Sequence, residues 1–120
     1  MQLKDKDLPQ INQELLDQDG YLKKTVQALV DHYHPIQIYL FGSKARSDDG
    51  PDSDYDLLVV VKRRVTREKK VKFHQIRWEL GLNEATDVVV ISEKWFRQRS
   101  TVKCSLPSTV IEEGKLLYAV

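Results

Sequence analysis

The chain has little of what would direct it to an oxidising compartment or into a membrane. Its one cysteine, Cys104, cannot form an internal disulfide, which favours a reducing cytosol. The first seven residues lack the apolar core of a signal peptide, and the longest apolar runs are far shorter than a bilayer span. We therefore expect a soluble cytoplasmic protein without a membrane partner.

An excess of one charge is also missing. The chain has 19 basic and 18 acidic residues and a formal net charge of +1, so no global field draws it to nucleic acid. A dense basic run between residues 62 and 72 is the local exception. It lacks the interleaved aromatic residues that stack on bases, and is more typical of a solvated surface than of a site for RNA, triphosphate or an acidic partner. Nucleic acid is not an expected partner.

Three common site signatures are absent. The histidines, His32, His34 and His74, do not have the spacing of zinc ligands. No Gly-x-x-x-x-Gly-Lys-Ser/Thr sequence occurs, which excludes a P-loop protein. No Gly-x-Ser-x-Gly sequence occurs, which argues against a serine hydrolase.

What the sequence does contain is an alternation of helix and strand patterns. Apolar residues at helical spacing predict a helix over residues 22–33, ended by Pro35. The remaining predictions are strands over 36–41, 54–61 and 86–91, helices over 43–47, 67–80, 93–98 and 107–113, a turn over 48–52, and a final extended piece over 115–120. Pro9–Leu16 is either a separate helical turn or an extension of the 22–33 helix. The strand over 54–61 is apolar on both faces after its acidic opening, as in a central, covered strand.

This order predicts an α/β (α+β) fold, in which helices pack on a small mixed β-sheet. The 120 residues suffice for one compact domain and are too few for two, so we expect a single domain over residues 1–120.

Two acids open the second predicted strand. Asp54 and Asp56 are two residues apart, so their side chains point to the same face, with Cα atoms about 6.6 Å apart. Carboxylates this close at the edge of an apolar core repel each other, and a divalent cation such as Mg²⁺ relieves the repulsion. Asp87 opens the next strand. If the two strands are neighbours, three acids could hold two metal ions of the kind that promote phosphoryl-type transfer.

A Gly-Ser turn precedes the acids. Gly42 would let the backbone approach a phosphate closely, and Ser43 offers a hydroxyl at the start of a short helix whose free N–H groups favour anions. Lys44 and Arg46 add positive charge, and a guanidinium can grip two phosphate oxygens at once. We therefore expect Arg46 to face the phosphates.

Gly42-Ser43, ten intervening residues and then Asp54-Tyr55-Asp56 resemble the signature of the polymerase-beta-like nucleotidyltransferase superfamily. The chain is most similar to the minimal nucleotidyltransferases (MNT), short single-domain proteins that often act as antitoxins beside a helical HEPN-type toxin. The resemblance covers about residues 36–91, and more weakly 111–118. Ser47 stands where many members have glycine.

The resemblance implies a nucleoside triphosphate and two Mg²⁺ ions. It assigns phosphate contacts to Gly42, Ser43 and Arg46. It assigns metal binding to Asp54 and Asp56. Asp87 would be the third acid, as a metal ligand and candidate base.

The implied activity is transfer of a nucleoside monophosphate, expected to be AMP from ATP, to a hydroxyl of a HEPN-type toxin. Too little chain follows residue 91 for an acceptor domain, so the acceptor should come from a partner or a subunit interface. Val71 and Trp78, with Trp95 and Phe96, form either a docking surface or core. Two other functions stay open: a non-catalytic antitoxin that occludes its partner, and a small-molecule nucleotidyltransferase acting at a homodimer interface.

Overall fold

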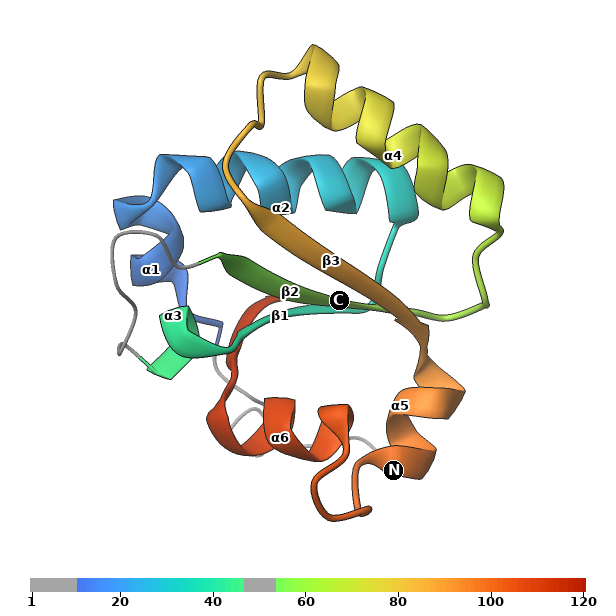
Figure 1. The fold of residues 1–120 in the computed structure, drawn as a ribbon. Coiled ribbons are helices and arrows are strands. Elements are labelled where there is room, and N and C mark those ends of the chain that lie inside the picture. Colours follow the sequence, from blue (N-terminus) through green and yellow to red (C-terminus); the bar gives the residue numbers. More distant parts are fainter. Residues whose placement is uncertain (1–10, 47–53) are drawn as a thin grey trace.

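The structure, a computed structural model, describes residues 11–46 and 54–120 (Figure 1). The predicted turn over 48–52 and the first residues of the Pro9–Leu16 segment lie outside this part of the chain. The described elements are α1 (Gln13–Gln18), α2 (Gly20–Tyr33), β1 (Gln37–Phe41), α3 (Ser43–Arg46), β2 (Tyr55–Val61), α4 (Arg67–Glu79), β3 (Thr86–Ser92), α5 (Glu93–Arg99), α6 (Leu106–Glu113) and β4 (Lys115–Ala119).

The strands form one mixed sheet in the order β3-β2-β1-β4. β1 runs antiparallel to both β2 and β4, whereas β2 and β3 are parallel. A parallel pair needs a crossover connection, and α4 supplies it. The predicted α/β (α+β) class with a small mixed sheet is therefore confirmed, and β2 is an interior strand as its two apolar faces indicated.

Helices cover both faces of the sheet. α2 and α4 lie on one side, and α5 and α6 lie on the other (Figure 1). The alternation along β2 follows these layers: Leu57 and Val59 join the core cluster that includes residues of α2 and α4, whereas Leu58 and Val60 join the cluster with Val110 of α6. These four side chains of β2 are fully buried, so β2 packs against helices on both faces of the sheet.

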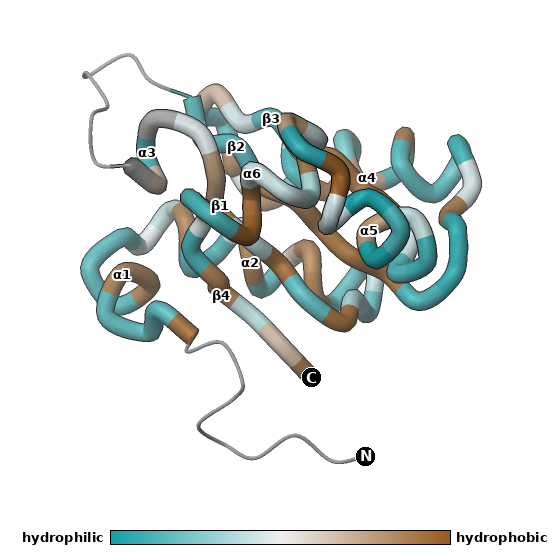
Figure 2. The backbone as a smooth tube through the Cα atoms, turned by 90° about the horizontal axis from the view of Figure 1, so that it is seen from below, coloured by the Kyte–Doolittle hydropathy of each residue, from teal (hydrophilic) through white to brown (hydrophobic). Residues whose placement is uncertain are grey.

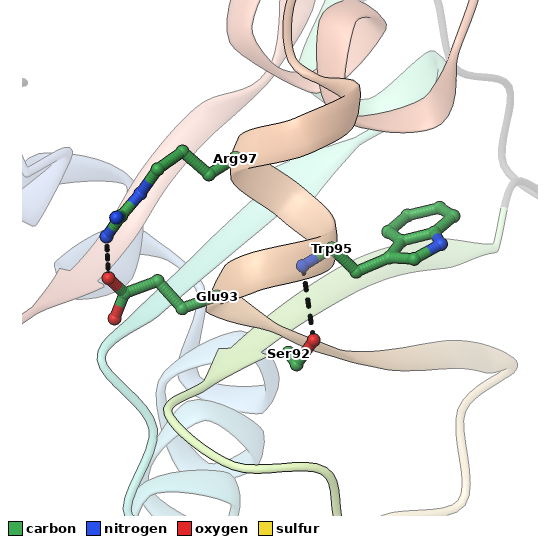
Figure 3. Close-up of polar contacts among 4 residues, drawn as sticks. All are labelled: Ser92, Glu93, Trp95 and Arg97. Atoms are coloured by element: carbon green, nitrogen blue, oxygen red, sulfur yellow. Dashed lines mark hydrogen bonds and ion pairs between the residues drawn. The ribbon is translucent and has the colours of Figure 1, made fainter.

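Side-chain caps define where the helices begin. Asp19 has an extended backbone and its carboxylate accepts a hydrogen bond from Leu22 N, so α1 is a separate helix and not an extension of α2. Thr66 and Ser105 cap α4 and α6 in the same way. Ser92 caps α5 by accepting from Trp95 N, and an ion pair links Glu93 in the first turn of α5 to Arg97 in its last turn (Figure 3). Each of these caps satisfies a backbone N–H group that the helix itself leaves unpaired.

None of the helices within the described ranges is both long enough and apolar enough to cross a bilayer.

Candidate active site

The parallel pairing of β2 with β3 brings the acidic residues together. Asp56 lies opposite Asp87 in register, on strands whose spacing is about 4.8 Å. Side-chain alternation places both on the sheet face that carries Leu58 and Val89, the face toward α6. Asp54 precedes Asp56 by two residues and therefore opens the same face. The two strands are therefore neighbours, with Asp87 opposite Asp56.

The electrostatics of Asp56 reflect this crowding. Burial is the main cause that raises the pKa of the Asp56 carboxyl above its ordinary value of 3.8, and the negative charges of Asp87 and Asp54 raise it further. Asp54 and Asp87 are themselves exposed. The three acids therefore interact electrostatically, and the effect falls on Asp56, the half-buried member of the group.

The Gly-Ser turn lies directly against this group. Phe41 is paired with Asp56, and Gly42 follows it with a positive φ of 76°, a backbone conformation that favours glycine. A Cβ atom at Gly42 would lie 2.2 Å from Asp56 Oδ2. Glycine is therefore required at position 42 for two reasons: the positive φ of the turn and the close approach of the backbone to the Asp56 carboxylate.

α3 begins where the turn ends. It spans Ser43–Arg46, and Ala45 N donates to Gly42 O at 3.1 Å, which closes the first turn of the helix. The backbone thus brings the start of α3 to the edge of the sheet where the acids gather. The side chains of Ser43 and Arg46 lie outside what the structure describes, so their phosphate contacts stay predictions.

Two tyrosines in ring contact, each with its own hydrogen bonds, lie on the opposite face of the sheet. Tyr55, between the two acids of β2, donates through its hydroxyl to Asp19 Oδ2 at 2.7 Å. Its ring lies against Tyr21, with centroids 5.1 Å apart, and Lys44 Nζ lies 4.4 Å from the Tyr55 ring centroid. Burial and the neighbouring Asp19 raise the pKa of Tyr55 strongly, so its hydroxyl remains a donor. Sequence reasoning did not identify this pair.

The predicted docking surface is divided by the fold. Val71 and Trp78 on α4 are exposed, with 58% and 80% of their surface accessible, so they are not core. Phe96 instead follows the core alternative, because α5 turns it onto the sheet, where its ring stacks on that of Tyr39 with centroids 5.8 Å apart. Trp95 is half-buried, and the Arg99 guanidinium lies over it. Figure 3 shows Trp95 pointing away from the Glu93–Arg97 pair.

The basic run lies at the surface, as expected of a solvated face. The side chains of Lys62, Arg63 and Arg64 are exposed, and hydrophilic segments of α4 alternate with short hydrophobic ones (Figure 2). His32 of α2 contacts the start of α4, since its Nε2 lies 2.7 Å from Lys69 O.

A family model described as a nucleotidyltransferase domain matches residues 22–117. The chain belongs to the nucleotidyltransferase domain family. The match includes the Gly-Ser turn, Asp54 and the strand β2 that follows it, and β3, which contains Asp87. No curated protein matches the chain.

Solved structures of toxin–antitoxin complexes contain chains with a similar fold. A toxin–antitoxin complex with AMP-PNP contains one that is 26% identical, with a TM-score of 0.59; the alignment covers 82% of this chain and 73% of the other. The MntA–HepT toxin–antitoxin complex gives 25% identity and a TM-score of 0.54, covering 83% and 71%. The same values are found for a complex of the tri-AMPylated HEPN toxin of Shewanella oneidensis with its MNT antitoxin.

The acids of the candidate site are not arranged as a complete metal site among the described residues. Within residues 11–46 and 54–120, no three side chains of His, Cys, Asp or Glu are grouped closely enough to hold a metal ion. The acids are coupled through Asp56 but do not converge on one point, and two of them are exposed.

The raised pKa of Asp56 predicts a pH-dependent cost to stability. Its folded pKa exceeds the unfolded value, so the destabilisation is absent at pH values below the unfolded pKa and grows as pH rises through the folded pKa. Without metal, Asp56→Asn should raise the melting temperature at pH 7, and this gain should vanish near pH 3. Thermal unfolding in EDTA at both pH values measures it. Asp31→Asn, at an exposed position on α2, is the control; a lower melting temperature of Asp56→Asn at pH 7 would contradict the prediction.

Proposed function

We propose that this nucleotidyltransferase is a Mg²⁺-dependent protein adenylyltransferase that transfers AMP from ATP to a hydroxyl of a HEPN-type toxin, and so acts as its antitoxin. The observation that carries the proposal is the register of β2 and β3, which places Asp87 opposite Asp56 beside the Gly42 turn. Support also comes from the similar chains, which occur in toxin–antitoxin complexes, one with AMP-PNP and one with an AMPylated toxin.

The acids suit a divalent cation by their chemistry. Three carboxylates provide the hard oxygen ligands that Mg²⁺ prefers, and their charges already raise the pKa of Asp56. Asp54 and Asp87 are exposed, so rotation of their side chains toward Asp56 meets little packing resistance. These three residues would hold the metal, which when bound neutralises charge on the triphosphate and on the departing pyrophosphate.

The remaining steps belong to the chain itself. The Gly42 turn and the start of α3 would bind the β- and γ-phosphates, with Ser43 and Arg46 as donors. The acceptor hydroxyl oxygen attacks the α-phosphorus, a P–O ester bond forms, and the bond to the β-phosphate oxygen breaks with its electrons leaving on pyrophosphate. Asp87 is exposed and can take the proton of the hydroxyl as it attacks.

A second candidate is an antitoxin that neutralises its partner by occlusion alone. The exposed Val71 and Trp78 on α4 favour a binding role, since they are available for contact with another protein. Burial, and then the charges of Asp87 and Asp54, raise the pKa of Asp56 and so destabilise the fold at neutral pH, a cost without function in such a protein. The observations therefore favour the enzyme. A small-molecule transferase at a homodimer interface has no specific observation in its favour.

A reconstituted transfer assay tests the proposed function. The protein is mixed with the product of its neighbouring gene, ATP labelled at the α-phosphate, and Mg²⁺; we expect covalent label on the neighbour and release of unlabelled pyrophosphate. The matched reaction contains EDTA, and a second contains ATP labelled at the γ-phosphate, neither of which should label protein. A tight complex without label would support occlusion instead, and label on a low-molecular-weight acceptor would support the small-molecule enzyme.

A further inference from the structure

The residue between the two acids of β2 points away from them. Successive side chains of a strand alternate between faces, so Tyr55 lies on the α2 side of the sheet while Asp54 and Asp56 lie on the other. There its hydroxyl donates to Asp19 Oδ2 at 2.7 Å, and Asp19 Oδ1 accepts from Leu22 N at 3.0 Å. One carboxylate thus ties the start of β2 to the start of α2.

Tyr21 extends this connection to the strand that carries the third acid. Its ring lies against Tyr55, and its hydroxyl is 2.7 Å from Thr86 Oγ1 and donates to Glu84 O at 2.9 Å. Thr86 immediately precedes Asp87 and is the register partner of Tyr55. Tyr55 is thus the chain neighbour of Asp54 and Asp56, and Tyr21, which packs on it, contacts Thr86, the chain neighbour of Asp87.

Lys44 connects the same ring to the Gly-Ser turn. It belongs to α3, directly after Gly42 and Ser43, and its Nζ lies 4.4 Å from the centroid of the Tyr55 ring. An ammonium group at this distance is attracted to the face of an aromatic ring. Tyr55 thus contacts the helix that follows the turn as well as the elements that position the acids.

We propose that Tyr55 is a positioning residue, which sets the distance between the predicted phosphate-binding turn and the three carboxylates through its contacts with Asp19, Tyr21 and Lys44. The inference rests on the proposed function, because it takes these carboxylates as the metal site. Its physical basis is that reacting groups held by one packed side chain keep their geometry, and a displacement of about 1 Å can lower a rate on the order of 100-fold.

Direct Mn²⁺ binding tests the proposal without relying on activity. Mn²⁺ is titrated into the full chain with AMP-PNP, and bound metal is measured by electron paramagnetic resonance. We expect about tenfold weaker binding for Tyr55→Leu, which loses the ring and the hydroxyl. Tyr55→Phe, which keeps the ring beside Tyr21 and Lys44, should weaken binding only about threefold. Tyr118→Phe, at a half-buried tyrosine on β4, removes a hydroxyl remote from the acids and should bind like the parent.

Transfer kinetics give a second readout, and the outcomes separate the two proposals. We expect Tyr55→Leu to lower kcat about tenfold or more while KM for ATP changes less than twofold. Parent-like Mn²⁺ binding by both Tyr55 variants would overturn the positioning role and leave the proposed function standing. The same loss in Tyr118→Phe as in Tyr55→Phe would also overturn it, as a general effect on the fold. Absence of Mn²⁺ binding in the parent protein would overturn both.

Discussion

Replacing Asp54 or Asp56 by asparagine is expected to lower nucleotide transfer by at least about 1,000-fold and leave the domain folded. Each change removes one negative oxygen ligand from the predicted metal site, and charge neutralisation by a metal is worth several kcal/mol in such reactions. The fold should persist, because Asp54 is exposed and the ionised Asp56 destabilises the metal-free protein. The measurement is the initial rate of label transfer from α-labelled ATP, with circular dichroism as the check on folding.

Asp31→Asn provides the matched control, since it makes the same chemical change at an exposed position on α2. It should transfer label at the parental rate. Transfer within tenfold of the parental rate by either site variant would remove the metal role from these acids, and would leave occlusion of the partner as the better account of an antitoxin.

The strands were predictable because their apolar patterns are local. Residues 57–61 are apolar on both faces, and only an interior strand buries both, so the position of β2 in the sheet followed from its own sequence. Helix starts also depend on local signals: Asp19 caps α2, and Pro107 occupies the first turn of α6.

The site was only partly predictable, because its geometry depends on pairings between distant residues. Asp54 and Asp56 could be placed on one face from their spacing, but the position of Asp87 required the parallel register of β2 with β3. A shift of one residue would have turned Asp87 to the other face. The hydrogen bond from Tyr55 to Asp19 spans 36 residues, and no local pattern indicates it.

The aromatic residues show the same limit. The sequence left open whether Val71, Trp78, Trp95 and Phe96 form a docking surface or core. The fold buries Phe73 of α4 against α2 and leaves Trp78 exposed. Phe96 packs on the sheet from the other side, because α4 and α5 lie on opposite sides of the sheet (Figure 1). The outcome depends on how each helix is turned toward the sheet, which no local pattern decides.

Substitution of Gly42 by alanine is expected to lower transfer at least about 100-fold, because the new Cβ would lie 2.2 Å from Asp56 Oδ2 and one of the two must move. The positive φ of 76° adds a cost of about 1–2 kcal/mol for any residue with a side chain. We therefore expect Gly42→Ala to lose activity and stability together, as measured by label transfer and by urea unfolding.

Gly81→Ala separates the two causes. Gly81 has a φ of 70°, and nothing lies within 4 Å of its Cβ position, so this variant carries the backbone strain without the clash. Strain should lower its free energy of unfolding by about 1–2 kcal/mol, and its transfer rate should not change. A second change completes the argument: Asp56→Ala removes the clashing oxygen, so the loss of stability from Gly42→Ala should be smaller in the Asp56→Ala background than in the parent. Equal losses in both backgrounds would show that Gly42 is required by the turn alone and not by its approach to the carboxylate.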